Sequence, residues 1–504
     1  MEKRDVLKLC MKNGFFLDRS MLDFFCGMEE REVRQIVEKL RNFGVVEKIL
    51  TEEIFEKHKE KLGIRNQEFG SVGICGVEIL RETRRDFEKL GASDFVSYFR
   101  VRFEALRDIL IKRGDLVNLS SIRRIGWDNG LFCFVGMVYD KRITKNKNLL
   151  IEVEDLTGRT VVLVNRENKQ LFEQAQSLLL DDVVAFKCSG SGKMLFASEF
   201  IYPNSCLDRE NFGDSDEFVA FISDLHVGSK MFLEKNLMRF VNWLNGEVGD
   251  ERQKNLAAKV KYLVLVGDNI EGVGVYPGQE KFLKIKGCRG QYEKLARILG
   301  RIRTDIEIVM IPGQHDAVWI GEPMPALADK WSGNLGKMKN LKMVSNPAEL
   351  KIGGLKILVY YGGSLNKFID EIGDIRVNYG HRNPVRVVEE ILKRRHLAPV
   401  YGEMDIVPSK EGDDLVLKDL PDVFVVGGQH RTMIGSYNNI LTISTSCFQS
   451  QTDFEIMVGN EPDPCKVPIL NLKSKEVKIL DFSGGEVVWE EGDDLICKLD
   501  GGGR

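Results

Sequence analysis

The chain has 504 residues, 72 of them basic and 76 acidic, so its formal net charge is only −4. This balance excludes a protein held on nucleic acid by overall charge alone, although it leaves room for a local basic groove. No apolar run reaches the roughly 20 residues that span a bilayer, and the N-terminus lacks the apolar core of a signal peptide. The ten cysteines are scattered without a CxxC pair, as is typical of reduced thiols. We therefore expect a soluble, cytoplasmic protein of two to four domains that has no membrane partner.

The N-terminal part of the chain predicts a small helical module at residues 1–62. Four apolar residues in it recur at the spacing of one helix face: Val33, Ile36, Val37 and Leu40. Residues 63–115 predict a glycine-interrupted linker followed by a helix. Ser93 or Asp94 is the expected N-cap of that helix, because both residue types accept hydrogen bonds from free helix amides.

Residues 116–212 change to the period of β-strands. Three strand-like runs, a helical stretch at QLFEQAQSLLL and a hairpin at DVVAFKCSGSGKMLFASEFI follow one another, which is the order of a five-stranded OB-fold barrel. Such barrels often bind single strands through basic loops. The first strand-like run is followed by basic residues, namely Lys141, Arg142, Lys145 and Lys147. A solvated hairpin loop beside core phenylalanines is the favoured explanation of these residues, because no aromatic partner lies near the lysines in the sequence and many such barrels dock proteins.

From residue 213 to 485, strand-like and helical stretches alternate, which predicts an α/β domain. Five short apolar runs have the composition of buried strands, and each ends in polar residues or glycine: FVAFISDLH, KYLVLVGDN, IEIVMIPGQHD, LKILVYYGG and DVFVVGGQH. Because α/β sheets form their sites outside the carboxyl ends of the strands, these five ends predict one common site. The last segment, 486–504, is acidic and predicts a mobile tail.

The residues at these strand ends suit a metal ion. Asp224 and His226 are two positions apart, so they project to the same side of an extended chain. Asp268, His315 and His430 end three of the other runs, and three of the six histidines are thus concentrated here. Carboxylate and imidazole are good ligands for first-row metals. Each residue alone is explained as a turn or cap, but together they predict a metal site.

The motifs DLH, GDN, GQHD, YGG and GGQH resemble the five motifs of the calcineurin-like metallophosphoesterases. More narrowly, the stretches FISDLHVGSK, LVGDNIEGVGVYPGQE, PGQHDAV, VEEILKRRHLAPVYG and QTDFEIMVGNEPDPCKVPILNL are similar to the small subunits of archaeal family-D DNA polymerases. The resemblance implies a calcineurin-like αββα sandwich at 213–485 behind the OB-fold domain. It also implies a 3′–5′ exonuclease site, a large catalytic polymerase subunit as partner, and DNA as primer–template or single strand. A sliding clamp is a further candidate partner.

The resemblance assigns roles to individual residues. One divalent transition metal ion, such as Mn, Zn or Fe, would be held by Asp224, His226, Asp268 and His430, all of which are present. His315 corresponds to the family's general acid near the leaving group. The family's remaining ligands, which hold a second ion alone, are replaced here at three places that we call the second-metal positions: Gln314, Tyr361 and Gly428.

We therefore expect one tightly bound metal ion at most. Nuclease activity should be weak or absent, because a two-metal site clamps both the attacking and the leaving oxygen. The leading interpretation is a subunit that scaffolds the large polymerase subunit. The alternatives are an active metal-dependent 3′–5′ exonuclease that proofreads for it and, less favoured, a free-standing phosphoesterase or repair nuclease. Whether the chain is an enzyme in its own right stays open.

Two segments are candidates for contacts with DNA or the partner subunit. Lys393, Arg394 and Arg395 follow an apolar helical pattern, where they suit either phosphate or the dipole of the helix C-terminus. The segment 454–472 contains three prolines that favour an extended, preorganised docking segment. A wall strand with a rigid turn is the alternative. The contact residues that we expect in this segment are Phe454, Met457 and Val458.

Overall fold

The computed structural model describes residues 3–12, 15–17, 33, 37, 49–50, 76–83, 89–126, 130–191, 194–410, 412–489 and 496–498. The chain divides into two compact units, Met1–Gly76 and Val77–Arg504. In the first unit α1 (Lys3–Lys12) precedes β1 (Phe16–Leu17) and β2 (Ile49–Leu50), which pair in parallel. Only Val33 and Val37 of the helix predicted near them are described. Most of the helical module predicted at 1–62 therefore lies outside the described residues.

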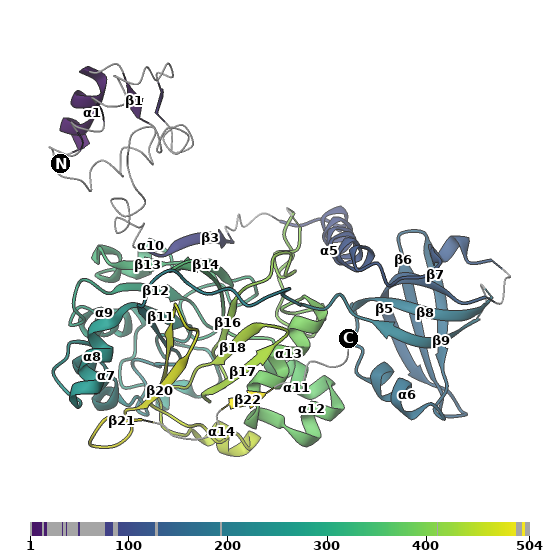
Figure 1. Ribbon diagram of the computed structural model, residues 1–504. Helices are drawn as coiled ribbons and strands as arrows, with labels where there is room; N and C mark the ends of the chain where they lie inside the picture. Colours follow the sequence, from purple (N-terminus) through teal and green to yellow (C-terminus); the bar gives the residue numbers. More distant parts are fainter. Residues whose placement is uncertain are drawn as a thin grey trace. The chain divides into compact units, whose positions relative to one another are not determined.

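Two seven-stranded sheets form the body of the second unit (Figure 1). The first sheet contains, in spatial order, β13 (Leu341–Met343), β12 (Glu307–Ile311), β11 (Val260–Val266), β10 (Phe218–Ile222), β19 (Lys466–Asn471), β20 (Val477–Asp481) and β21 (Val488–Trp489). The second contains β22 (Ile496–Lys498), β17 (Met433–Tyr437), β18 (Ile440–Ser444), β16 (Val423–Val426), β15 (Leu355–Tyr360), β14 (Ala348–Ile352) and β3 (Glu78–Glu82).

The central strands are buried on both faces, which explains their continuous apolar runs. In β10, Val219 and Phe221 share a core with Val425 of the other sheet, whereas Ala220 and Ile222 face the covering helices. Helices cover the outer face of each sheet. Those on the first sheet are α7 (Glu234–Leu244), α8 (Glu251–Lys259) and α9 (Cys288–Leu299), and those on the second are α11 (Leu365–Glu371) and α13 (Pro384–Arg394). The result is a four-layered sandwich of helices, two sheets and helices.

A closed barrel precedes the sandwich. Its five strands are β5 (Phe132–Ile143), β6 (Leu149–Asp155), β7 (Gly158–Val164), β9 (Met194–Ile201) and β8 (Val183–Ser191), and β8 pairs back to β5. The short β4 (Leu119–Ser120) pairs with β5, and α6 (Lys169–Gln176) lies between β7 and β8 in the chain. The hairpin predicted between β8 and β9 is confirmed. Among the described residues, no helix is both long and apolar enough to cross a bilayer.

Several local features differ from the expectations. The helix α5 (Ala92–Lys112) has Gly91 as its N-cap, so the predicted cap at Ser93 or Asp94 is wrong. Asp94 lies three residues into the helix, where its carboxylate accepts a hydrogen bond from the Gly91 amide at 2.8 Å. The range predicted as a linker contributes β3, which pairs with β14. The range predicted as a mobile tail contributes β21 and β22, and its mobility stays a prediction.

Candidate metal site

The carboxyl ends of five strands meet where the two sheets face each other. The strands β10, β11 and β12 run parallel in one sheet, and β15 and β16 run parallel in the other. Asp224 and His226 follow β10, Asp268 follows β11, His315 follows β12 and His430 follows β16. The His226 ring centroid lies 4.7 Å from that of His315 and 5.5 Å from that of His430. Four segments far apart in the sequence thus bring these side chains into one site.

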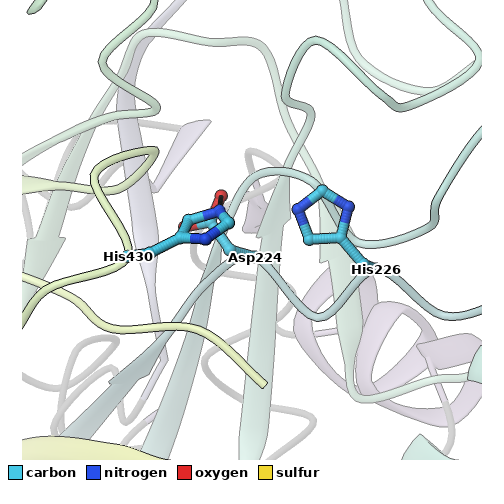
Figure 2. Close-up of side chains that lie close together, drawn as sticks. All are labelled: Asp224, His226 and His430. Carbon is cyan, nitrogen blue, oxygen red and sulfur yellow. Dashed lines mark ion pairs between the residues drawn. The ribbon is translucent and has the colours of Figure 1, made fainter. Parts of the chain in front are cut away.

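Three side chains in this site could bind one ion together. The ligand atoms of Asp224, His226 and His430 all lie within 4.8 Å of one another (Figure 2). Oδ1 of Asp224 is 3.4 Å from Nε2 of His430, and Nε2 of His226 is 3.8 Å from Oδ2 of Asp268. Two ligands bound at roughly 2.1 Å to one ion lie roughly 3 to 4 Å apart, so these spacings suit a common metal ion that also binds Asp268.

Two buried polar atoms support this interpretation. Oδ1 of Asp224 and Nε2 of His226 are buried and accept or donate no hydrogen bond. The other oxygen of Asp224 accepts hydrogen bonds from the Ser223 hydroxyl at 2.5 Å and from the Gly428 amide at 3.0 Å. A buried polar atom without a partner costs free energy, which a bound cation would offset. The donor set therefore fits a divalent transition metal.

The backbone at the four proposed ligands is strained. Asp224, His226, Asp268 and His430 have φ angles of 49°, 48°, 46° and 55°, in the left-handed region that residues other than glycine rarely adopt. Such conformations persist only where the surrounding structure enforces them, and they cluster at functional sites. One strained residue would be ordinary, but four in one cluster indicate a site built to hold these side chains in place.

Each proposed histidine ligand is oriented by a buried carboxylate. Nδ1 of His226 donates to Glu271 at 3.1 Å, and Nδ1 of His430 donates to Glu455 at 2.7 Å. Both contacts leave Nε2 directed at the metal position, as is usual for metal-bound histidines. The sequence analysis did not single out Glu455. The Thr452–Glu455 spacing signals a capping box, but no local pattern indicates the contact with His430.

The electrostatics of the site follow from these pairs. Burial alone would raise the pKa of Glu271, but the hydrogen bond and charge of His226, together with His315 and Gln279, outweigh it and lower that pKa to about 2. Burial likewise opposes the charged form of Asp224, whereas His430 brings its pKa below the ordinary value. Burial and the nearby Asp268 carboxylate raise the pKa of Asp316 to about 6. Glu271 and Asp224, whose pKa values histidines lower, are thus ionised at neutral pH.

Tyr361 fills the space at the second-metal positions. Its hydroxyl donates to Oδ2 of Asp268 at 2.6 Å, and its ring is 6% exposed. A Cβ atom added at Gly428 would lie only 3.3 Å from Cζ of this ring and 2.9 Å from the Tyr361 carbonyl oxygen. Oδ2 of Asp268 therefore accepts from a protein hydroxyl on the side of the second-metal positions.

His315 lies on the other side of Asp268. Its backbone amide donates to Oδ1 of Asp268 at 2.8 Å, and its Nδ1 lies 2.8 Å from the Glu271 carbonyl oxygen. Because a carbonyl only accepts, Nδ1 carries the proton. Nε2 therefore faces the site, 3.9 Å from Oδ2 of Asp268.

The structure contradicts the predicted DNA or partner contacts at Arg394 and Arg395. Arg394 is 2% exposed, donates to both oxygens of Asp182 at 3.0 and 3.1 Å and also pairs with Glu390. Arg395 is also buried and donates to the Lys418 carbonyl. Arg394 ends α13 and ties it to the barrel through Asp182, whereas Arg395 is the C-cap residue, so both agree with the alternative of cations at a helix C-terminus. Lys393 keeps part of its side chain exposed and stays a prediction.

The segment 454–472 is not one extended docking segment, because it divides into a helix and a core strand. Its first residues belong to α14 (Asp453–Val458), and its last belong to β19, which is buried between β10 and β20. The wall-strand alternative therefore holds for β19. The large side chains of α14 are exposed, and we call them its outer face: Phe454 (64%), Ile456 (62%), Met457 (76%) and Val458 (41%).

The chain is similar to DNA polymerase subunits in sequence, and a distant solved structure matches part of it. The family of the B subunits of DNA polymerases alpha and epsilon matches residues 219–434. The DNA polymerase II small subunit of Methanothermobacter thermautotrophicus is 38% identical over 407 residues, which cover 81% of this chain and 83% of that protein. The protein of the same name from Archaeoglobus fulgidus is 33% identical, over 92% of this chain and 95% of that one. Among solved structures, Vps29 from Entamoeba histolytica in complex with zinc matches 55% of this chain and 99% of its own, at 14% identity and a TM-score of 0.26.

Proposed function

The chain belongs to the family of DNA polymerase II small subunits, and we propose that it scaffolds the large catalytic subunit of that polymerase rather than acting mainly as a nuclease. One observation carries the second half of this proposal. The hydroxyl of Tyr361 donates a hydrogen bond to Asp268 on the side where the family's second ion would bind. The fold and the first set of ligands are kept while the second set is replaced, as expected for a protein retained for its assembly role.

The outer face of α14 is our proposed contact with the large subunit. Four large apolar side chains on a six-residue helix are exposed, although apolar side chains at this density are usually covered in the functional assembly. Interfaces derive most of their affinity from a few such apolar anchors. Because Glu455 of α14 contacts His430, a partner docked on this helix would lie beside the metal site.

Co-purification tests this contact. Replacing Phe454, Met457 and Val458 by glutamate should strongly reduce recovery of the large subunit, while circular dichroism of the isolated chain stays unchanged because these side chains are exposed. The matched control is Ile143→Glu, which places the same charge on an exposed apolar residue (63% exposed) of the barrel. Unchanged affinity of the triple variant would place the interface elsewhere.

We also propose one divalent transition metal ion in the site, held by Asp224, His226, Asp268 and His430. When bound, such an ion polarises water or a phosphoryl oxygen. His315 presents Nε2 to the same space and suits proton transfer to a leaving oxygen. Without a second ion at the second-metal positions the site lacks the clamp on the second oxygen, and for this reason we expect weak nuclease activity.

The alternative function is an active 3′–5′ exonuclease on single-stranded DNA that proofreads for the polymerase. The unpartnered atoms of Asp224 and His226 favour it, because they are what an intact first metal position would require. Degradation of an end-labelled single strand by the purified chain in Mn²⁺ separates the two functions. The scaffold proposal expects no more cleavage than the Asp268→Ala variant gives. Robust cleavage that Asp268→Ala abolishes would establish the nuclease instead.

For the barrel we propose an OB fold. Five strands closed by the β5–β8 pairing, with α6 before β8, support this assignment. Lys141, a candidate for DNA contact, donates to the carbonyl oxygen of Gln176 at 3.1 Å and also to that of Leu178. Its ammonium group is thus engaged in the barrel itself, and a protein-docking role for this domain agrees better with the structure.

A further inference from the structure

The helix α14 is inverted relative to an ordinary surface helix. Its apolar side chains are exposed, whereas its buried side chain is the carboxylate of Glu455, at 5% exposure. Burying a carboxylate is costly unless it is paired and hydrogen-bonded. The partners of Glu455 therefore indicate what this helix is positioned to do.

Both oxygens of Glu455 are engaged. Oε1 accepts the hydrogen bond from Nδ1 of His430 at 2.7 Å. Oε2 accepts from the backbone amide of Thr452 at 2.7 Å and from the Thr452 hydroxyl at 2.9 Å. The Thr452 contacts form the capping box that starts α14, so the same carboxylate that begins the helix also fixes the imidazole.

The contact determines which nitrogen of His430 faces the site. With Nδ1 held by Glu455, Nε2 points toward Oδ1 of Asp224, 3.4 Å away. The His430 backbone is held separately, because its carbonyl accepts from the Asp463 amide at 3.1 Å. Glu455 is thus the side chain that holds Nδ1 of the His430 ring. We propose that Glu455 is the positioning residue for His430, so that the metal affinity of the site depends on the placement of α14.

This inference rests on the proposed metal site, and it adds a route by which docking on the outer face of α14 would act on that site. Whatever moves the helix moves Glu455, and hence Nε2 of His430. The large subunit is the partner that we propose for this face. Its binding should therefore tighten or loosen the hold on the ion without touching any ligand.

Calorimetric titration of the full chain with Mn²⁺ tests the proposal. Loss of a carboxylate that orients a histidine ligand typically weakens metal binding about 10- to 100-fold, which is the expectation for Glu455→Ala. Glu455→Gln should retain much of the affinity, because an amide oxygen still accepts from Nδ1. Asp453→Ala removes an exposed carboxylate from the same helix and should leave the affinity unchanged. Thr452→Ala weakens only the cap and should cost less than Glu455→Ala.

The proposal is overturned if Glu455→Ala and Asp453→Ala bind Mn²⁺ with equal affinity. It is also overturned if Thr452→Ala loses as much Mn²⁺ affinity as Glu455→Ala, because the effect would then come from the stability of the helix. A second readout needs no metal. With the six histidines ¹⁵N-labelled, the Nδ1 proton of His430 should be protected from exchange in the parent and unprotected in Glu455→Ala. A protected proton in a chain that binds no Mn²⁺ would uphold the positioning role and refute the metal site, whereas an unprotected proton in the parent would refute the positioning role.

Discussion

Replacing Tyr361 by phenylalanine tests whether its hydroxyl takes the place of a second ion. The substitution keeps the ring and removes the donor 2.6 Å from Oδ2 of Asp268, in a place where both side chains are buried. Leaving a buried acceptor without its partner costs about 1–3 kcal/mol. In the presence of a chelator we therefore expect Tyr361→Phe to lower the free energy of unfolding by about that amount.

Mn²⁺ should reduce this deficit. The oxygen that loses the hydroxyl becomes free to bind the ion held by Asp224, His226 and His430, so the variant's affinity for Mn²⁺ should exceed that of the parent. A ligand that binds only the folded chain stabilises it by about 2.7 kcal/mol at 100 times its dissociation constant, and by more if it binds more tightly. Urea unfolding followed by tryptophan fluorescence, with chelator and with Mn²⁺, measures both effects, since Trp243 is buried in the sandwich core.

The neighbouring tyrosine provides a matched control. The Tyr360 hydroxyl donates to Oε2 of Glu322, also at 2.6 Å and also buried, but away from the metal ligands. Tyr360→Phe should therefore show a similar deficit that Mn²⁺ does not narrow. The reasoning fails if Mn²⁺ narrows both deficits equally, or if Tyr361→Phe is as stable as the parent in chelator.

Three further predictions concern the second-metal positions, the barrel contact and pH. Gln314→Asn, Tyr361→His and Gly428→His together restore the family's ligands. This triple variant should bind two Mn²⁺ ions instead of one and should cleave single-stranded DNA faster than the parent. A stoichiometry that stays at one would contradict the prediction. Arg394→Ala leaves the buried Asp182 carboxylate without its ion pair and weakens the pairing of Glu390, so it should destabilise the chain by about 3–5 kcal/mol in urea unfolding. Unchanged stability with weaker DNA binding would restore Arg394 as a phosphate contact. Burial raises the pKa of Glu322 to about 7, so its contribution to stability is complete below its ordinary value of 4.5 and is lost as pH rises through 7. Glutamine at position 322 cannot ionise. Between pH 4.5 and 8 the free energy of unfolding of Glu322→Gln should therefore rise by about 3 kcal/mol relative to that of the parent. If urea unfolding gives the same pH dependence of this free energy for both proteins, the assignment is refuted.

The sequence predicted those features that depend on local pattern. Continuous apolar runs indicated strands buried on both faces, and the carboxyl ends of parallel strands necessarily meet at one edge. Asp224, His226 and His430 could therefore be grouped without coordinates. The second-metal positions, by contrast, were identified from the family resemblance, although each lies at the end of such a run.

The contacts that decide how the site behaves join residues far apart in the chain. The Tyr361–Asp268 hydrogen bond spans 93 positions, and the Arg394–Asp182 pair spans 212. No periodicity carries such information, and so the basic run around Arg394 predicted a surface contact although the guanidinium is buried. The prolines after α14 misled in the same way, because Pro468 lies inside β19, and pairing with β10 and β20 overrides the local preference.

The changes at positions 361 and 428 belong together sterically. The tyrosine ring lies where any side chain at position 428 would begin, since a Cβ atom there would be 3.3 Å from Cζ. The same Cβ atom would lie 2.9 Å from the Tyr361 carbonyl oxygen, so a side chain at 428 requires both the ring and this backbone to shift, and glycine avoids that cost. The ring in turn brings the hydroxyl that satisfies Asp268. In the proposed site, a protein hydrogen bond thus satisfies the Asp268 oxygen on the side of the second-metal positions, and the packing of Tyr361 against Gly428 holds the hydroxyl there.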